Sequence, residues 1–144
     1  YQSNVVKGEL EKAGVTVTVY TFADSNDVAA VTATACDENE VLYIPTDNTA
    51  ASCTEAINNV AEPAGVPIIA GEEGICAGCG VATLSINYYD LGVTTGEMAV
   101  KILTGEANIS EMPIEYFPNP VKKYNPAICE ALGVTVPEDY VAIG

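Results

Sequence analysis

Short segments rich in β-branched residues alternate with helical patterns along most of this chain of 144 residues. Helical patterns run from Asn26-Asp27 to Ala35 and from Asn48 or Thr49 to Val60, the latter ended by Pro63 and Gly65. The strand-like segments are residues 15–20, 41–44, 66–70 and 81–86. The middle two are largely apolar, which predicts strands buried on both faces. The alternation predicts an α/β fold with a parallel sheet flanked by helices.

The chain opens on a helical pattern, residues 2–13, that places Val6, Leu10 and Ala13 on one stripe and ends at Gly14. A doubly wound lobe normally begins with a strand that leads into its first helix. We therefore expect a strand and its loop upstream of this pattern, and we expect the chain to be a fragment.

The pattern changes after the fourth strand-like segment. Asp90 precedes a long helical pattern, residues 91–104, and a short extended piece is expected at residues 114–117. Asn125 and Pro126 then provide a cap and first residue for a last helix, which Gly133 ends.

The charge balance restricts the partners of this chain. Twenty acidic residues stand against five lysines, with no arginine and no histidine, for a net charge of −15. A phosphate backbone would be repelled, so we expect no nucleic-acid partner. The commonest general base and zinc ligand is absent, and we expect no catalytic residue, cofactor or metal. No apolar run reaches the length needed to span a bilayer.

Polar loops follow three of the predicted strands. Because ligands bind beyond the carboxyl ends of strands in open parallel sheets, these loops predict a binding site along one sheet edge. The loops are residues 45–49, 71–74 and 87–90.

The first loop contains Thr46, Asp47, Asn48 and Thr49. Its simplest role is to cap the following helix, although such a cap also exposes N–H groups that can hold a carboxylate.

The other two loops carry acids and tyrosines. Glu72 and Glu73 form a solvated bend or, if one faces a cleft, bind a ligand ammonium group. Tyr88 and its neighbour Tyr89 are either core edge or an aromatic wall. Asp90 either caps the long helix or pairs with an α-amino group. Aromatic faces beside a carboxylate suit an amino acid with an apolar side chain.

Five cysteines include the pair Cys76 and Cys79, spaced as CxxC. A lone CxxC is a weak signal for redox or metal chemistry. The other cysteines do not supply a second metal-binding pair, so a local disulfide or packed thiols are the favoured interpretations.

The loop sequences resemble a known family. Residues 43–49, 71–74 and 86–92, followed by Thr95-Gly96, are similar to tryptophan/tyrosine-type substrate-binding lipoproteins of ABC transporters. Residues 109–116 and 131–138 are similar too, so the resemblance covers almost the whole chain in order. Asn87 departs from it, since many members have aspartate there, and so does the cysteine pair.

The resemblance implies a type I periplasmic-binding fold, in which two α/β lobes joined by three crossovers close around a solute. Residues 1–88 would form the second lobe without its first strand, and residues 89–113 a hinge crossover and helix associated with the first lobe. Residues 114–144 would return and pack on the second lobe. Gln2 resembles a glutamine early in the first helix of that lobe.

The implied function is capture of a small solute, an aromatic amino acid, outside the membrane and its delivery to an ABC permease, without enzymatic activity. The protein would be a cell-surface lipoprotein or periplasmic. One alternative is a thiol or metal-binding domain using Cys76 and Cys79. A flavodoxin-like signalling domain fits less well, because the chain has no lysine between Lys12 and Lys101.

Overall fold

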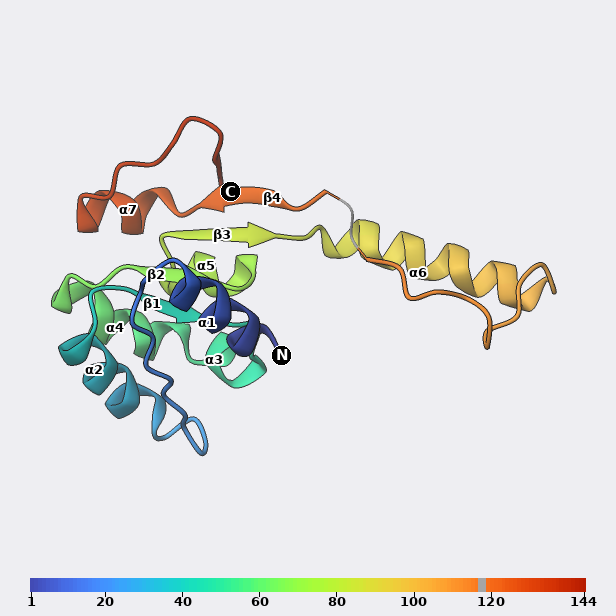
Figure 1. Cartoon of the computed structure of the whole chain (residues 1–144). Helices are drawn as coiled ribbons and strands as arrows, with labels where there is room; N and C mark the ends of the chain where they lie inside the picture. The colour runs from blue at the N-terminus through green and yellow to red at the C-terminus, as the bar shows by residue number, and fades with distance from the viewer. Residues whose placement is uncertain (117–118) are drawn as a thin grey trace.

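The computed structural model describes residues 1–116 and 119–144 (Figure 1). Five of its strands form one sheet, in the order β1-β2-β3-β4-β5. β1, β2 and β3 are parallel to one another, β4 is antiparallel to β3, and β5 is parallel to β4. The strands are β1 (Leu42–Ile44), β2 (Ile68–Ala70), β3 (Ala82–Ser85), β4 (Val121–Tyr124) and β5 (Val141–Ala142). The predicted α/β fold with a mainly parallel sheet flanked by helices is confirmed.

The core lies between one face of the sheet and three helices. Val28 from α2, Ile57 from α4, Ile68 from β2 and Ile75 from α5 are each at most 2% exposed and belong to one apolar cluster. Burying each such side chain stabilises the fold by about 1.5–3 kcal/mol. The helices are α1 (Gln2–Lys12), α2 (Val28–Glu38), α3 (Asn48–Ser52), α4 (Thr54–Ala64), α5 (Glu73–Cys79), α6 (Tyr88–Leu103) and α7 (Pro126–Leu132).

The expectation that the second and third strand-like segments are buried on both faces is wrong: all three residues of β1 are only half-buried, and β2 is open on one face. Ile68 and Ala70 point into the core, whereas Ile69 between them is 39% exposed. The reason is that the core helices cover one face of the sheet and leave part of the other face open.

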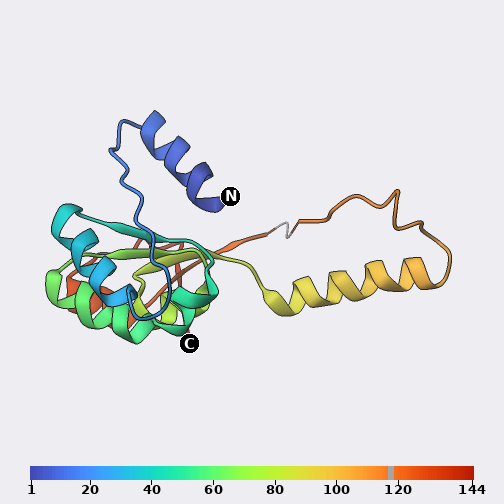
Figure 2. The same cartoon turned by 90° about the horizontal axis from the view of Figure 1, so that it is seen from below.

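The predicted strand at residues 15–20 is also wrong. These residues pair with no strand of the described sheet, which ends at β1. The segment is held through a side chain instead, because the Tyr20 hydroxyl donates to Glu38 at 2.6 Å and accepts from Asn39 at 2.9 Å. α1 before it buries none of its residues and stands off the sheet in Figure 2.

The single helix expected between β1 and β2 is two helices, α3 and α4, which meet at Cys53. The backbone of Cys53, with φ −119° and ψ 16°, leaves the helical region and breaks the run. Pro63 lies inside the last turn of α4, and Gly65, in the left-handed conformation at φ 71°, ends the helix as predicted.

An arm made of α6 and residues 104–116 projects from the sheet in both views (Figures 1 and 2). No residue of α6 is buried, and its apolar side chains Val93, Val100 and Leu103 are 45%, 57% and 85% exposed. The expected extended piece at residues 114–117 has no regular structure as far as residue 116, and its last residue lies outside the described ranges. Within those ranges, no helix combines the length and apolar character that a membrane span requires.

Candidate functional site

The carboxyl ends of β1, β2 and β3 bring the three predicted loops to one edge of the sheet. The first two loops touch, because the Gly71 N–H donates to Ile44 O at 2.7 Å and the Thr46 hydroxyl donates to Gly71 O at 3.3 Å. Glu73 from the second loop shares a surface hollow with residues 87–89 of the third. The three loops therefore lie along one edge of the sheet, as the parallel order of the strands predicted.

In the first loop, Asp47 caps α3 by accepting a hydrogen bond from the Ala50 N–H at 2.8 Å. Asn48 and Thr49 form the first turn of this five-residue helix. Gln2 fixes the preceding residue from α1: its side chain accepts from the Thr46 N–H at 2.9 Å and donates to the Thr46 hydroxyl at 3.2 Å. Because Asp47 already occupies the amino end of α3, its carboxylate would compete with any incoming anion there.

The two glutamates of the second loop have different partners. Glu72 caps α5, accepting from the Gly74 N–H at 2.8 Å and also from the Ile75 N–H. This cap turns the expected solvated bend into the start of a helix, which the glycine-rich sequence did not indicate. Glu73 instead pairs with Lys123 of β4, with 2.7 Å between Oε2 and Nζ.

In the third loop, Asn87 rather than Asp90 caps α6. The Asn87 side chain accepts from the Tyr89 N–H at 2.9 Å and from the Asp90 N–H at 3.3 Å, so the helix begins three residues earlier than expected. Tyr88 and Tyr89 are 54% and 79% exposed, which excludes the core-edge interpretation for both rings. Asp90 is exposed in the first turn of α6.

A hollow of about 340 Å³ opens between the second and third loops and β4. Its volume lies within the range of about 300–1,000 Å³ that is usual for small-molecule sites. Its charged lining residues among those described are Glu73 and Lys123, one of each sign. The full lining comprises Glu73, Ser85, Ile86, Asn87, Tyr88, Tyr89, Val121 and Lys123.

Of the predicted site residues, the structure brings Glu73 and Tyr88 into this hollow. Thr46, Asp47, Asn48 and Thr49 lie farther along the same edge, and Glu72 is held by its cap. Lys123 was not predicted. The sequence analysis predicted no element over β4, and only the pairing of this strand with β3 places the lysine at this edge.

Cys76 and Cys79 do not form the disulfide considered above, and both are free thiols. α5 directs them into the core, where they are 0% and 2% exposed, and the Cys79 thiol donates to Ile75 O at 3.4 Å. Burial, as the largest cause, raises the pKa of each thiol to about 12. Buried thiols that hold their protons this strongly are poor nucleophiles.

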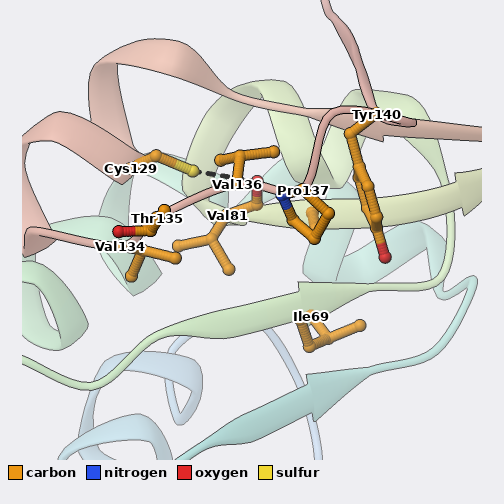
Figure 3. Close-up of a pocket in the computed structure, with 9 residues that line it drawn as sticks. Ile69, Val81, Cys129, Val134, Thr135, Val136, Pro137 and Tyr140 are labelled. Carbon is orange, nitrogen blue, oxygen red and sulfur yellow. Dashed lines mark hydrogen bonds between the residues drawn. The ribbon is translucent and has the colours of Figure 1, made fainter.

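A second, smaller hollow of about 110 Å³ lies away from the loop edge and is nearly all apolar (Figure 3). It lies between the sheet and the segment after α7, with Ile69, Val136 and Tyr140 in its wall. The Cys129 thiol beside it donates to Val81 O at 3.3 Å. The wall offers no charged group to orient a solute.

Comparison with known proteins identifies the family of this chain. The model of the ABC transporter substrate binding protein family matches residues 1–143. The chain belongs to this family. A tyrosine-binding protein of Clostridioides difficile (strain R20291) is 33% identical over 93 residues, which are 65% of this chain and 27% of that protein.

Solved structures of substrate-binding proteins have the same fold. One is the ligand-free, open structure of a substrate-binding protein with adhesive properties from Clostridium difficile, which is 34% identical, with TM-score 0.77. The match covers 99% of this chain and 48% of that protein's chain. Another is an ABC domain from Streptococcus pneumoniae in complex with L-Trp, which is 30% identical, with TM-score 0.86. That match covers 95% of this chain and 46% of the other protein's chain. The chain thus spans about half the length of the solved relatives it matches.

Proposed function

We propose that this family member is the extracytoplasmic solute-binding component of an ABC importer and captures an aromatic amino acid in a cleft between two lobes. The hollow at the carboxyl edge of β2 and β3 carries this proposal. It is large enough for a small solute, has two exposed tyrosines in its wall and contains one charge of each sign. The relatives named for tyrosine and found with L-Trp support the choice of solute class.

In this proposal the sheet edge is one wall of the cleft. Glu73 and Tyr88 contact the solute, and Thr46, Asp47, Asn48, Thr49, Glu72 and Asp90 form the rim that meets the opposite lobe. Such closure around a ligand buries it from both sides. A single open wall cannot do so, and residues 1–144 alone would therefore bind solute weakly.

In the same proposal, the projecting arm connects the two lobes. Residues 89–113 cross to the other lobe and pack on it, and residues 114–144 return to the sheet. The exposed apolar side chains of α6 support this, because a helix with Val93, Val100 and Leu103 open to solvent lacks the partner that such a surface normally has.

The loaded protein would deliver its solute to an ABC permease from the outer side of the membrane, as a periplasmic protein or a lipid-anchored one. No catalytic step belongs to this role, and the raised pKa values of the Cys76 and Cys79 thiols oppose the alternative of a thiol-based activity.

Isothermal calorimetry on the full-length protein with L-tryptophan, L-tyrosine and L-phenylalanine tests the proposal. We expect saturable one-to-one binding of at least one of them, and at least tenfold weaker binding by residues 1–144 alone. Absence of heat with all three amino acids removes the aromatic assignment. Equally tight binding by the isolated residues refutes the two-walled cleft.

A further inference from the structure

Lys123 and Glu73 lie in the hollow as a bridge between two separate elements. Lys123 comes from β4 and Glu73 from the first turn of α5, and their charged atoms are 2.7 Å apart. Their side chains are 27% and 38% exposed, so solvent and solute reach both groups. Ion pairs with this much exposure contribute at most about 1 kcal/mol to stability. Fold stability therefore gives little reason for a lysine at this position.

The placement of Lys123 is notable in a chain with five lysines and a net charge of −15. Lys7 and Lys12 pair with glutamates of α1, and Lys101 lies in the last turn of α6. Lys122, next to Lys123, pairs with Asp139 at 2.5 Å. Of the described residues that line the hollow, Lys123 alone is a cation.

Two side-chain acceptors beside the pair are already used as helix caps. Glu72 uses both carboxylate oxygens to cap α5, and Asn87 uses its side-chain oxygen to cap α6. The charged groups that a solute meets in the hollow are the Lys123 ammonium and the Glu73 carboxylate, which are paired with each other and can change partners.

We propose that the Lys123–Glu73 pair is an exchangeable ion pair that makes the site selective for zwitterions. The carboxylate of an α-amino acid takes the Lys123 ammonium, and the amino acid's ammonium takes the Glu73 carboxylate. This inference rests on the function proposed above and adds the groups that recognise the solute backbone. A zwitterion leaves neither protein charge without a partner, whereas a solute with one charge leaves one of them unpaired in a partly desolvated site.

The magnitude of the selectivity follows from the cost of losing one charged partner. Hydrogen bonds to charged groups contribute enough to change affinity about 10- to 100-fold. Removing the solute's carboxylate or its ammonium should therefore weaken binding to the wild-type protein by about that factor.

Calorimetry on the full-length protein with three matched probes tests this exchange. The probes are L-tyrosine, L-tyrosinamide without the carboxylate and 3-(4-hydroxyphenyl)propanoate without the ammonium, with the corresponding L-tryptophan series measured in parallel. Lys123→Gln should weaken binding of the amino acid about 10- to 100-fold and leave that of the amide within about threefold. Glu73→Gln should likewise weaken binding of the amino acid and spare that of the propanoate.

Lys122→Gln is the matched control, because it removes the neighbouring ion pair on the same strand outside the hollow, and it should change none of the affinities. If Lys123→Gln and Glu73→Gln leave amino-acid binding unchanged, or weaken all three probes by the same factor, the exchange is refuted while the proposed function stands. If the wild-type protein binds neither amino acid, the proposed function fails and this inference fails with it.

Discussion

Gly71 lies where the first two loops of the sheet edge touch, and adding a single methyl group there tests how tightly they pack. An alanine Cβ at this position would lie 2.7 Å from Thr46 N and 2.8 Å from Pro45 C, both backbone atoms. To restore an ordinary contact of 3.4 Å, the first loop must move by roughly 0.7 Å. This movement strains the Gly71 N–H hydrogen bond to Ile44 O, which is 2.7 Å long.

Overpacking of this kind typically costs about 1–3 kcal/mol, and we expect Gly71→Ala to lower the free energy of unfolding by that amount. The backbone of Gly71 does not have a positive φ, so the expected loss is due to the steric clash and not to the conformation. Urea unfolding followed by circular dichroism measures the change.

Gly74→Ala is the matched control, three residues later in the same loop. Its new methyl group lies 3.2 Å from the Glu72 carboxylate oxygens, which need to shift by only a few tenths of an ångström and are not backbone atoms, and alanine is favoured over glycine in a helix such as α5. Its free energy of unfolding should stay within about 0.5 kcal/mol of the wild type or rise. Equal stability of the two variants would refute the packing of the loops described above.

Three further predictions concern a buried hydroxyl and the thiols. Thr83 is 2% exposed and its hydroxyl has no hydrogen-bond partner among the described residues, so Thr83→Val should raise the free energy of unfolding by about 1 kcal/mol. The same change at Thr32, whose hydroxyl donates to a backbone carbonyl 2.7 Å away, should lower it; a loss in both variants would contradict this reasoning. At pH 8, a thiol reagent should modify the partly exposed Cys53 in the native protein and leave Cys76 and Cys79 unmodified. Because the thiol pKa of the last two is about 12 in the folded protein and 9.0 ordinarily, stability is retained below pH 9 and falls as the pH rises toward 12. A double alanine variant should lose less over that range, and an equal loss would show that these thiols are not responsible.

The local patterns of the sequence predicted the elements that local chemistry decides. β1, β2 and β3 fall inside the predicted apolar segments, and α7 begins at Pro126 and ends at Gly133 as expected. α6 was predicted with a late start, since Asn87 was not recognised as its cap. In each of these cases, residues within a few positions of one another decide the outcome.

The errors concern contacts between distant parts of the chain. Residues 15–20 have the period of a strand, but pairing depends on a neighbour that the pattern does not include. Lys123 reaches the hollow only because β4 pairs with β3, and its partner Glu73 is 50 positions away in sequence. The position of the three loops could be predicted from the parallel order of the strands. The position of Lys123 opposite Glu73 could not, because it depends on the long-range antiparallel pairing of β3 and β4.

The most direct test of the proposed solute site is a nitrogen-15 NMR titration of the full-length protein with L-tyrosine and, separately, L-tryptophan. We predict that, in the part of the protein described here, the largest amide shifts fall on Glu73, residues 87–89 and Lys123, which surround the hollow at the sheet edge. Shifts that centre instead on the apolar hollow beside Val136 and Tyr140, or no shifts with either amino acid, would contradict this assignment.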